Sequence, residues 1–370
     1  MKKWIAILLA LALVLALAAC QTNTKPEDAN TGGPEAGASP SPASPSPSDE
    51  PPAAASDAPE ETPDAPEENP ASLHVAFLSG PTGIGAAKFM EQAEADALFD
   101  DYTVALETDP TAVVAALISG ELDIAAVPTN VAATLYNKTQ GNVKLAAINT
   151  LGVLYILENG DTVQSVADLA GKTVLATGQG SNPEFVLNYI LAQNGLTPGE
   201  DLTVEYLASD EVVTRMVSGN GDVCMLPVPA ATTVAMKNAD VRFALSLTDE
   251  WAAASGDGSV LTQGCIAVRT DKVDTAALAR FLEAYAASIA YMTDPANLDG
   301  AAALAVKFGI VGNETVAAKA IPDCNMVCIT GAADMRAALG AYYTVLLNAD
   351  PTSIGGAVPN DDFYLDVPAA

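Results

Sequence analysis

The chain has 370 residues, of which 46 are acidic and 16 are basic, and its formal net charge is −30 at neutral pH. A protein this acidic repels a phosphate backbone, which argues against nucleic acid as a partner. Half of the residues are hydrophobic but only 5% are aromatic, and the length is enough for two domains of ordinary size. With His74 as its single histidine, the chain offers little to catalytic or metal schemes built on imidazole.

The first 20 residues have the pattern of an export signal. Lys2 and Lys3 precede an apolar stretch from Trp4 to Leu17, which is shorter than the ~20 residues of a membrane span. The small residues before Cys20 suit a cleavage site. The Leu-Ala-Ala-Cys ending resembles the bacterial lipobox, which implies that Cys20 is diacylated and becomes the first mature residue. A retained apolar anchor is the alternative. No later segment is long and apolar enough to span a bilayer, so we expect the rest to be soluble and outside the cytoplasm.

Residues 21–72 have a different composition from the rest of the chain. They hold 12 of the 24 prolines, and 11 acidic residues against Lys25 alone. Ser-Pro runs recur at 39–42 and 44–47, and aliphatic residues are almost absent. Such a segment cannot bury enough apolar surface to offset its chain entropy. We therefore expect a disordered, proline-stiffened tether that holds a folded part away from a membrane, with partner recognition as the alternative role.

From Leu73 onward, short apolar strands alternate with helical periodicity, which favours an α/β fold with parallel strands. The chain also contains an internal repeat. Residues 113–128 read VVAALISGELDIAAVP and residues 212–227 read VVTRMVSGNGDVCMLP, and the two segments align without a gap. Each copy predicts a helix, a Ser-Gly stop, an acidic residue and a buried strand that ends in proline.

The repeat extends upstream into two glycine-rich loops. A predicted strand over 73–78 leads into Ser79–Gly83 and a helix from about 85 to 98. A second predicted strand over 172–176 leads into Thr177–Pro183 and a helix to about 194. A loop that opens a helix can hold an anionic or polar group with its free N–H groups and the helix dipole. Tight turns after the strands are the alternative for either loop alone, but two equivalent loops favour binding.

Together these features resemble an ABC-transporter solute-binding protein with the type 2 periplasmic-binding-protein fold. The segment Leu169–Val174, followed by the loop over 178–181, resembles the DLKGK motif and ligand loop of the sulfonate, nitrate, taurine and thiamine-precursor group. The resemblance covers about residues 73–365. It implies a small-molecule ligand and an ABC permease with its ATPase as partners, and no cofactor.

The resemblance also implies a two-lobed α/β protein, in which two similar domains are joined by a hinge of two strands. Residues 146–156 suit the outgoing crossing and residues 262–268 the return. Helices near 275–291 and 334–347 would pack onto the first domain. The implied boundaries are 73–151 plus 265–370 for domain I, and 152–264 for domain II.

In this fold the ligand lies in the cleft at the carboxyl ends of the strands. None of the candidate residues there is charged, so an anion would be held by N–H and hydroxyl groups, and a neutral or weakly cationic heterocycle would fit equally well. Trp251 is either a stacking surface or a buried residue of domain II. The candidate ligand-binding residues are Ser79, Thr82, Gly83, Pro128, Thr129, Asn130, Asn149 and Thr150 from domain I, and Tyr155, Gln179, Gly180, Ser181, Asn182 and Pro227 from domain II.

Asp210 and Glu211 precede the helix of the second repeat copy. They either meet a cationic ligand or cap that helix, and we favour capping, with Ser209 as the N-cap residue.

Enzyme chemistry has little support in the sequence. His74 stands at the start of a predicted strand and has no second imidazole to complete a metal site. The cysteines after Cys20 contain no Cys-x-x-Cys pair, so neither a zinc ribbon nor a thioredoxin motif is indicated. Their disulfide state stays open; Cys324 and Cys328 can pair only if the chain between them turns tightly.

The sequence therefore predicts a monomeric receptor, held to the membrane only through the lipid on Cys20, that closes over a small polar molecule and delivers it to an ABC importer. The candidate ligands are a sulfonate, a nitrate-like anion and a thiamine-precursor-like heterocycle. Two alternatives are an enzyme on the same scaffold, of a pyrimidine-precursor or menaquinone pathway, and a surface sensor or adhesin module without a transport role.

Overall fold

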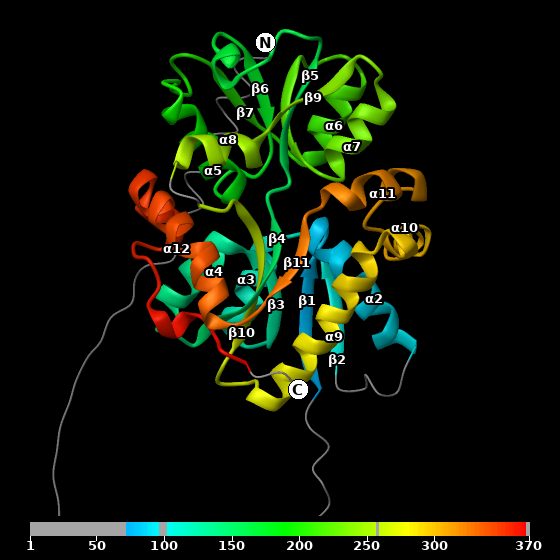
Figure 1. Ribbon diagram of the computed structural model, residues 1–370, viewed down its shortest axis with the longest axis vertical. Helices are drawn as coiled ribbons and strands as arrows, with labels where there is room; N and C mark the ends of the chain where they lie inside the picture. Colours follow the sequence, from blue (N-terminus) through cyan, green and yellow to red (C-terminus); the bar gives the residue numbers. More distant parts are fainter. Residues whose placement is uncertain (1–71, 96–101, 257–258, 368–370) are drawn as a thin grey trace, which may run out of the picture. The chain divides into compact units, whose positions relative to one another are not determined.

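Two mixed β-sheets organise the folded part of the chain (Figure 1). The computed structural model describes residues 72–95, 102–256 and 259–367, all within one compact unit. The predicted signal, the predicted lipidation at Cys20 and the predicted tether concern residues that lie outside the described ranges, except for Ser72. The first sheet has the order β11-β4-β10-β3-β1-β2 and the second the order β7-β6-β8-β5-β9, and we call the parts built on them the first and second lobes.

The strands of the first lobe come from both ends of the folded chain, because the second lobe is inserted between β4 and β10. The first sheet contains β1 (Leu73–Leu78), β2 (Tyr102–Glu107), β3 (Ile124–Pro128), β4 (Val143–Leu151), β10 (Thr262–Arg269) and β11 (Met326–Ile329). The second contains β5 (Leu154–Asn159), β6 (Thr173–Ala176), β7 (Thr203–Tyr206), β8 (Val223–Pro227) and β9 (Val241–Ser246).

The internal repeat is visible in how the strands pair. The repeated strands β3 and β8 hold equivalent places: β3 lies parallel to β1 and antiparallel to β10, and β8 lies parallel to β6 and antiparallel to β5. In each lobe, the antiparallel partner is a strand that adjoins the crossing between the lobes. This arrangement confirms the predicted fold of two similar α/β halves joined through a two-strand hinge.

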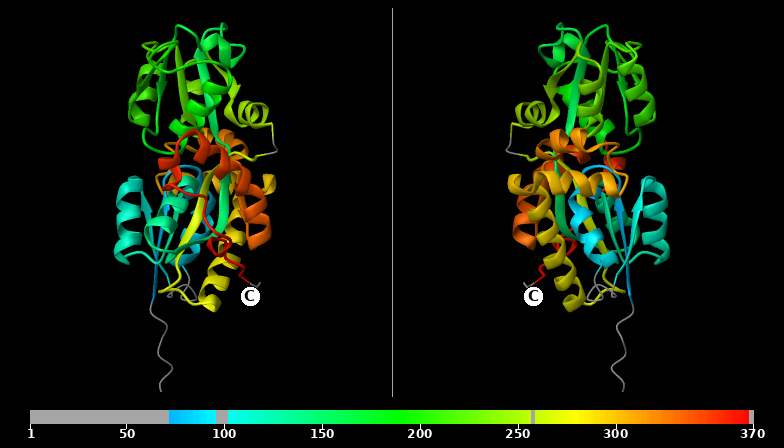
Figure 2. Two further views of the ribbon diagram at one scale, coloured as in Figure 1. Left: turned by 90° about the vertical axis from the view of Figure 1, so that its left-hand side faces the viewer. Right: turned by 90° about the vertical axis from the view of Figure 1, so that its right-hand side faces the viewer.

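Helices cover both faces of each sheet (Figure 2). Along β3, Ala125 and Val127 belong to one apolar cluster while Ile124 and Ala126 belong to another, so successive side chains enter separate cores. The helices of the first lobe are α2 (Pro81–Ala95), α3 (Pro110–Ser119), α4 (Thr129–Lys138), α9 (Thr275–Thr293), α10 (Leu298–Lys307), α11 (Glu314–Ala320) and α12 (Ala332–Ala349). Those of the second lobe are α5 (Asn182–Gln193), α6 (Ser209–Val217), α7 (Ala230–Lys237) and α8 (Leu247–Ser255).

The two C-terminal helices differ in what they contact. Helix α9 packs on α2 and β11 within the first lobe. Helix α12, predicted to pack onto the first domain, contacts β10 there but also reaches α5 of the second lobe. Its Tyr342 ring lies 5.2 Å from the ring of Trp251, measured between centroids. Helix α12 therefore joins the two lobes on one side of the hinge.

The caps of the repeated helices correct one prediction. Helix α3 ends at Ser119, and Gly120 follows with a left-handed φ of 81°, as the Ser-Gly stop predicts. Helix α6 begins at Ser209 itself, its N-cap residue is Ala208, and no side chain caps it. The prediction of Ser209 as the N-cap was therefore wrong by one residue.

Asp210 and Glu211 lie in the first turn of α6, where a carboxylate interacts favourably with the helix dipole. Within the described ranges, no helix is both long and apolar enough to cross a bilayer.

Candidate ligand-binding site

The hinge brings the two sheets close together at Gly152. This residue lies between β4 and β5, and a Cβ added to it would stand 2.1 Å from the hydroxyl of Thr248. Its carbonyl accepts a hydrogen bond from the side-chain amide of Asn325. The crossing therefore requires glycine for space, and Asn325, just ahead of β11, fixes its position.

Next to the hinge lies a hollow of about 290 Å³, which we call the interlobe cavity. It lies at the carboxyl ends of β1, β3, β6 and β8, where ligands bind in open α/β sheets. Its volume suits a small molecule. It is lined by Leu78, Ser79, Pro81, Thr82, Pro110, Val127, Pro128, Thr150, Val153 and Leu154, together with Thr177, Gly178, Ser181, Asn182, Pro183, Pro227, Gln263 and Gly264.

The N-termini of α2, α4 and α5 meet at this cavity, together with that of α3, whose first residue Pro110 lines it. Helix α2 begins at Pro81, α4 follows directly after Pro128, and Ser181 is the N-cap residue of α5. The first N–H groups of a helix have no partner within the helix, and the dipole makes this end positive. Because α2 and α4 come from the first lobe and α5 from the second, both lobes direct positive helix ends at the same space.

The cavity wall is uncharged. No Asp, Glu, Lys, Arg or His stands among its lining residues, whereas five of them are proline. Three of those prolines, Pro81, Pro110 and Pro183, lie in the first turns of α2, α3 and α5, where the missing N–H costs nothing. A ligand here meets apolar rings and backbone dipoles but no formal charge.

Several cavity hydroxyls already donate to neighbouring carbonyl oxygens. Thr82 Oγ1 donates to the carbonyl of Leu78 at 2.7 Å, and Ser181 Oγ donates to that of Gly178 at 2.9 Å. In this arrangement their oxygen lone pairs remain available to a ligand. Gln263 Nε2, by contrast, is buried and has no partner in the described part of the chain, so it is a donor that a ligand can satisfy.

The sequence-based candidates divide into two equal groups. Ser79, Thr82, Pro128, Thr150, Ser181, Asn182 and Pro227 line the cavity. Gly83, Thr129, Asn130, Asn149, Tyr155, Gln179 and Gly180 do not.

The members of the second group either are held in other contacts of the fold or are exposed outside the cavity. Gly83 is buried inside α2, where a Cβ would stand 2.8 Å from the carbonyl oxygen of Leu78. The side-chain amide of Asn130 donates to the carbonyl of Ser353, and that of Asn149 to the hydroxyl of Tyr285. Gln179 and Gly180 are exposed at the outer end of their loop.

A buried polar network supports the cavity from behind. Thr129 Oγ1 donates to the carbonyl of Thr262 at 3.0 Å, and Asn182 Nδ2 donates to the same carbonyl at 2.8 Å. The Tyr342 hydroxyl donates to Asn182 Oδ1. Burial raises the pKa of Tyr342, so its hydroxyl stays protonated and available as the donor. The network therefore ties the first residues of α4 and α5 to β10 and α12.

The two candidate aromatic residues lie outside the cavity. Trp251 is fully buried, and its ring N–H donates to Ser259 Oγ at 3.1 Å, so it is a core residue of the second lobe. Tyr155 is half-buried and packs edge-on against Phe243, with ring centroids 5.0 Å apart. Burial, and the nearby carboxylates of Asp323 and Asp249, raise the pKa of Tyr155.

The cysteines that the structure describes are Cys224, Cys265, Cys324 and Cys328, and all are free thiols. Cys328 belongs to β11, whose extended backbone separates it from Cys324. Burial raises the pKa of Cys224 and of Cys324 to about 12, so neither is a thiolate near neutral pH.

Some lining residues were not among the sequence-based candidates. Pro81, Thr177, Gly178 and Pro183 belong to the two predicted loops, which indicated their location without singling them out. Pro110 and Gln263 carried no comparable signal, because one begins α3 and the other lies in an apolar strand. Val153 and Leu154 follow Gly152 in the outgoing crossing, where the composition suggests only a buried strand. The remaining unpredicted lining residues are Leu78, Val127 and Gly264.

Two similar lobes, a two-strand hinge and a cavity at converging helix N-termini define a two-lobed solute-binding protein. Residues 97–290 match the family model described as "ABC transporter, phosphonate, periplasmic substrate-binding protein". The chain belongs to this family, and it is therefore an extracytoplasmic substrate-binding protein of an ABC importer. The family consists of binding proteins rather than enzymes. No curated protein matches the sequence.

Solved structures agree on the fold. An ABC transporter protein from Parabacteroides distasonis is 22% identical with a TM-score of 0.66, over 80% of this chain and 99% of that one. The periplasmic aliphatic sulphonate binding protein of Escherichia coli is 16% identical with a TM-score of 0.63, over 82% and 94%. The periplasmic nitrate-binding protein of Synechocystis PCC 6803 is 15% identical with a TM-score of 0.55, over 80% and 87%.

Proposed function

We propose that the ligand carried to the importer is a small organic oxyanion with an apolar substituent, such as an alkanesulfonate or alkylphosphonate. The observation that carries this proposal is the meeting of the N-termini of α2, α4 and α5 at an uncharged cavity. Backbone N–H groups and helix dipoles stabilise an anion without a charged side chain. No carboxylate lines the cavity to oppose it.

The apolar part of the wall supports an organic rather than an inorganic anion. Leu78, Val153 and Leu154 join the five prolines around the cavity, so a bare nitrate-like ion would leave most of the wall without a contact. An alkyl substituent buries that surface and gains about 0.8 kcal/mol for each CH₂ group. The sulphonate-binding protein of Escherichia coli, which shares the fold, is consistent with this ligand class.

A thiamine-precursor-like heterocycle is the second candidate, and one observation favours it. Thr82 and Ser181 use their hydroxyl protons on backbone carbonyls, so their oxygens accept hydrogen bonds from ligand N–H groups. The free amide of Gln263 would donate to a ring nitrogen. Such a ligand uses side chains, whereas an oxyanion uses the backbone, so the two candidates make different demands on the same cavity.

Transport follows from the way in which the cavity is shared. Its wall comes from both lobes, so a bound ligand contacts α2 and α5 at once and stabilises the arrangement in which the lobes are together. A permease can distinguish that arrangement from one in which the lobes are apart. We propose that the chain acts in this way as a binding protein and not as an enzyme or an adhesin.

The membrane anchor is a separate proposal that rests on the sequence of residues 1–72. We infer that Cys20 is lipidated and that residues 21–72 form a tether between the membrane and a monomeric folded part. Mass spectrometry of the N-terminal peptide purified from a bacterial membrane tests it. A diacylated Cys20 is the expected result, and an unmodified peptide that begins elsewhere contradicts the anchor.

Thermal-shift screening of the purified protein tests the ligand. Ethanesulfonate, butanesulfonate and ethylphosphonate are compared with nitrate and with a 4-aminopyrimidine. We expect the organic oxyanions to raise the melting temperature most, because a ligand at 100 times its Kd adds about 2.7 kcal/mol to the free energy of unfolding. A rise with the pyrimidine alone would favour the second candidate, and no rise with any compound would contradict both.

A further inference from the structure

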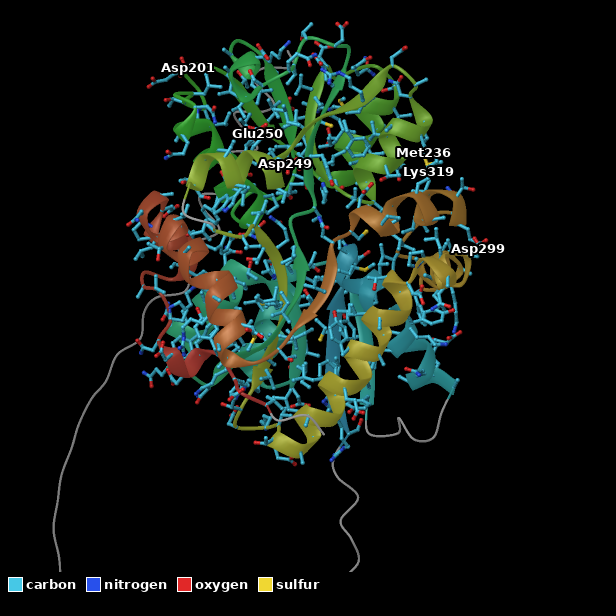
Figure 3. All side chains as sticks on the ribbon, in the orientation of Figure 1. Asp201, Met236, Asp249, Glu250, Asp299 and Lys319 are labelled. Atoms are coloured by element: carbon cyan, nitrogen blue, oxygen red, sulfur yellow. The ribbon has the colours of Figure 1, made fainter. Side chains whose placement is uncertain are left out.

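A second hollow lies between the lobes, at α7 and α11, and we call it the α7–α11 groove. It has a volume of about 440 Å³ and shares no lining residue with the interlobe cavity. Its wall combines Thr232, Ala235 and Met236 of α7 and Phe243 of β9 with Lys319 of α11 and Asp323 of the short helix η4 (Ile321–Asp323). Figure 3 labels Met236 and Lys319, which face this region from the second and first lobes.

One part of the groove is apolar and exposed. Met236 is 36% exposed and Phe243 is 38% exposed, which makes them two of the four large apolar side chains that stand out to solvent among the described residues. The Phe243 ring also packs edge-on against Tyr155, which holds it in place. A ligand that covered this surface would remove apolar area from water.

The other part carries two opposite charges without ion-pair partners. Lys319 lies in the last turn of α11 and Asp323 ends η4, and both are exposed. Neither forms an ion pair with the other or with any residue that the structure describes. Two nearby side chains of opposite charge that do not pair with each other can each bind one charged end of a single molecule.

An unpartnered hydroxyl belongs to a residue that lines the groove, and it is independent of the two charges. Thr232 is only 6% exposed, and its Oγ1 is buried with no hydrogen-bond partner in the described ranges. The neighbouring Thr233 Oγ1, by contrast, donates to the carbonyl of Pro229 at 3.1 Å. A buried hydroxyl without a partner is unfavourable, so a ligand that reached Thr232 would relieve that cost.

We propose that the α7–α11 groove binds a small zwitterion with an apolar side chain, of the size of a single apolar α-amino acid. Its carboxylate pairs with Lys319, its ammonium group pairs with Asp323, and its side chain covers Met236 and Phe243. The Thr232 hydroxyl completes the polar contacts. Because α7 belongs to one lobe and α11 to the other, the occupant bridges the lobes and favours the arrangement in which they are together.

Isothermal titration of the purified protein with L-leucine and L-phenylalanine tests the proposal. The comparison compounds are 4-methylpentanoate, which lacks the ammonium group of leucine, and 3-methylbutylamine, which lacks its carboxylate. We expect the amino acids to bind roughly tenfold more tightly than either compound, since each loses one charged contact. The absence of binding by both amino acids at millimolar concentrations would overturn the proposal.

Two pairs of variants locate the site. Lys319→Met should weaken amino-acid binding roughly tenfold, while Lys237→Met, at the exposed end of α7 outside the groove, should leave it unchanged. Thr232→Val should weaken binding several-fold, and Thr233→Val should not.

Thr232→Val should also leave the melting temperature equal or higher, because it removes an unpaired buried hydroxyl at nearly constant shape. If Lys319→Met bound the amino acids as tightly as the unaltered protein does, they would bind elsewhere, and the proposed site at the α7–α11 groove would be wrong. Because the groove and the cavity share no residue, that result would leave the oxyanion proposal standing.

Discussion

The two hollows between the lobes differ in the part of the protein that they present to a ligand. The interlobe cavity presents the backbone, through helix N-termini from both lobes and a wall without charge. The α7–α11 groove presents side chains, through Lys319, Asp323 and two exposed apolar residues. A protein of net charge −30 can therefore offer a favourable site to an anion, because helix ends act locally and do not depend on the overall charge.

The same difference explains why the sequence predicts the interlobe cavity but not the α7–α11 groove. The cavity follows glycine-rich loops and strand-ending prolines, and these recur in both halves of an internal repeat. The groove joins the side of α7 to α11, which lie about 80 residues apart in the sequence and have no repeated motif. Substitutions that remove a side chain but keep the backbone in place should therefore affect the two sites differently.

Asn182→Ala should have the largest effect, because it acts on the network behind the cavity. The substitution leaves the carbonyl of Thr262 and the hydroxyl of Tyr342 buried without this partner. We expect the free energy of unfolding to fall by about 3 kcal/mol and ligand affinity to fall with it. Urea denaturation measures the first, and exposed Asn220→Ala is the matched control. A change below about 0.5 kcal/mol would show that the network does not hold α5.

Gln263→Met should have a smaller effect, confined to binding. It replaces a buried amide that lacks a partner with an apolar side chain of similar size. We expect the affinity for an alkanesulfonate to fall no more than about tenfold, since the helix ends remain, with the melting temperature unchanged or raised. Gln179→Met is the control, because Gln179 is exposed outside the cavity. A loss of all binding in titration calorimetry would show that side chains, not the backbone, dominate this site.

Lowering the pH should reduce the free energy of unfolding through the second lobe and should not act through the cavity. This is the smallest of the three expected effects. Burial alone would raise the pKa of Glu158, but hydrogen bonds from Thr162 and Val163 and from Arg242, 2.9 Å away, lower it below its usual 4.5. A lowered folded-state pKa means that stability is present above pH 4.5 and is lost as the pH falls through the folded value.

Glu158→Gln should remove part of that loss, on the order of 1 kcal/mol between neutral and acidic pH, in urea denaturation at a series of pH values. Glu205→Gln, which alters a partly exposed ion pair with Arg215, is the control and should change little. Alkanesulfonate affinity should stay constant until the second lobe begins to unfold, because no side chain of the cavity wall titrates in this range. An earlier change in affinity would point to a charged group in the site.

The fold was predictable because the repeat places equivalent strands at equivalent positions. The glycine-rich loops and the prolines that end β3 and β8 likewise indicated the place of the cavity, and half of the candidate residues line it. Polar residues one or two positions further, such as Thr129 and Asn130, turned inward to Thr262 and Ser353, because α4 begins immediately after Pro128. Which face of the first helical turn meets the cavity depends on helix orientation, and loop composition does not specify it.

Contacts between distant segments were beyond the sequence. Tyr342 reaches Asn182 from a helix 160 residues later, and no local pattern marks that contact. Gln263 looks like one polar residue in an apolar strand, and only the position of β10 beside β3 and β4 brings it to the cavity. Position within the assembled sheet, rather than residue type, made these side chains part of the site.

A crystal structure of the protein with a bound alkanesulfonate would show whether helix N-termini at the interlobe cavity bind the oxyanion. We predict the sulfonate oxygens within hydrogen-bond distance of the first N–H groups of α2 and α5, with the alkyl chain against Leu154 and the prolines. A sulfonate held instead by a lysine or arginine outside the interlobe cavity would contradict a site built on helix N-termini.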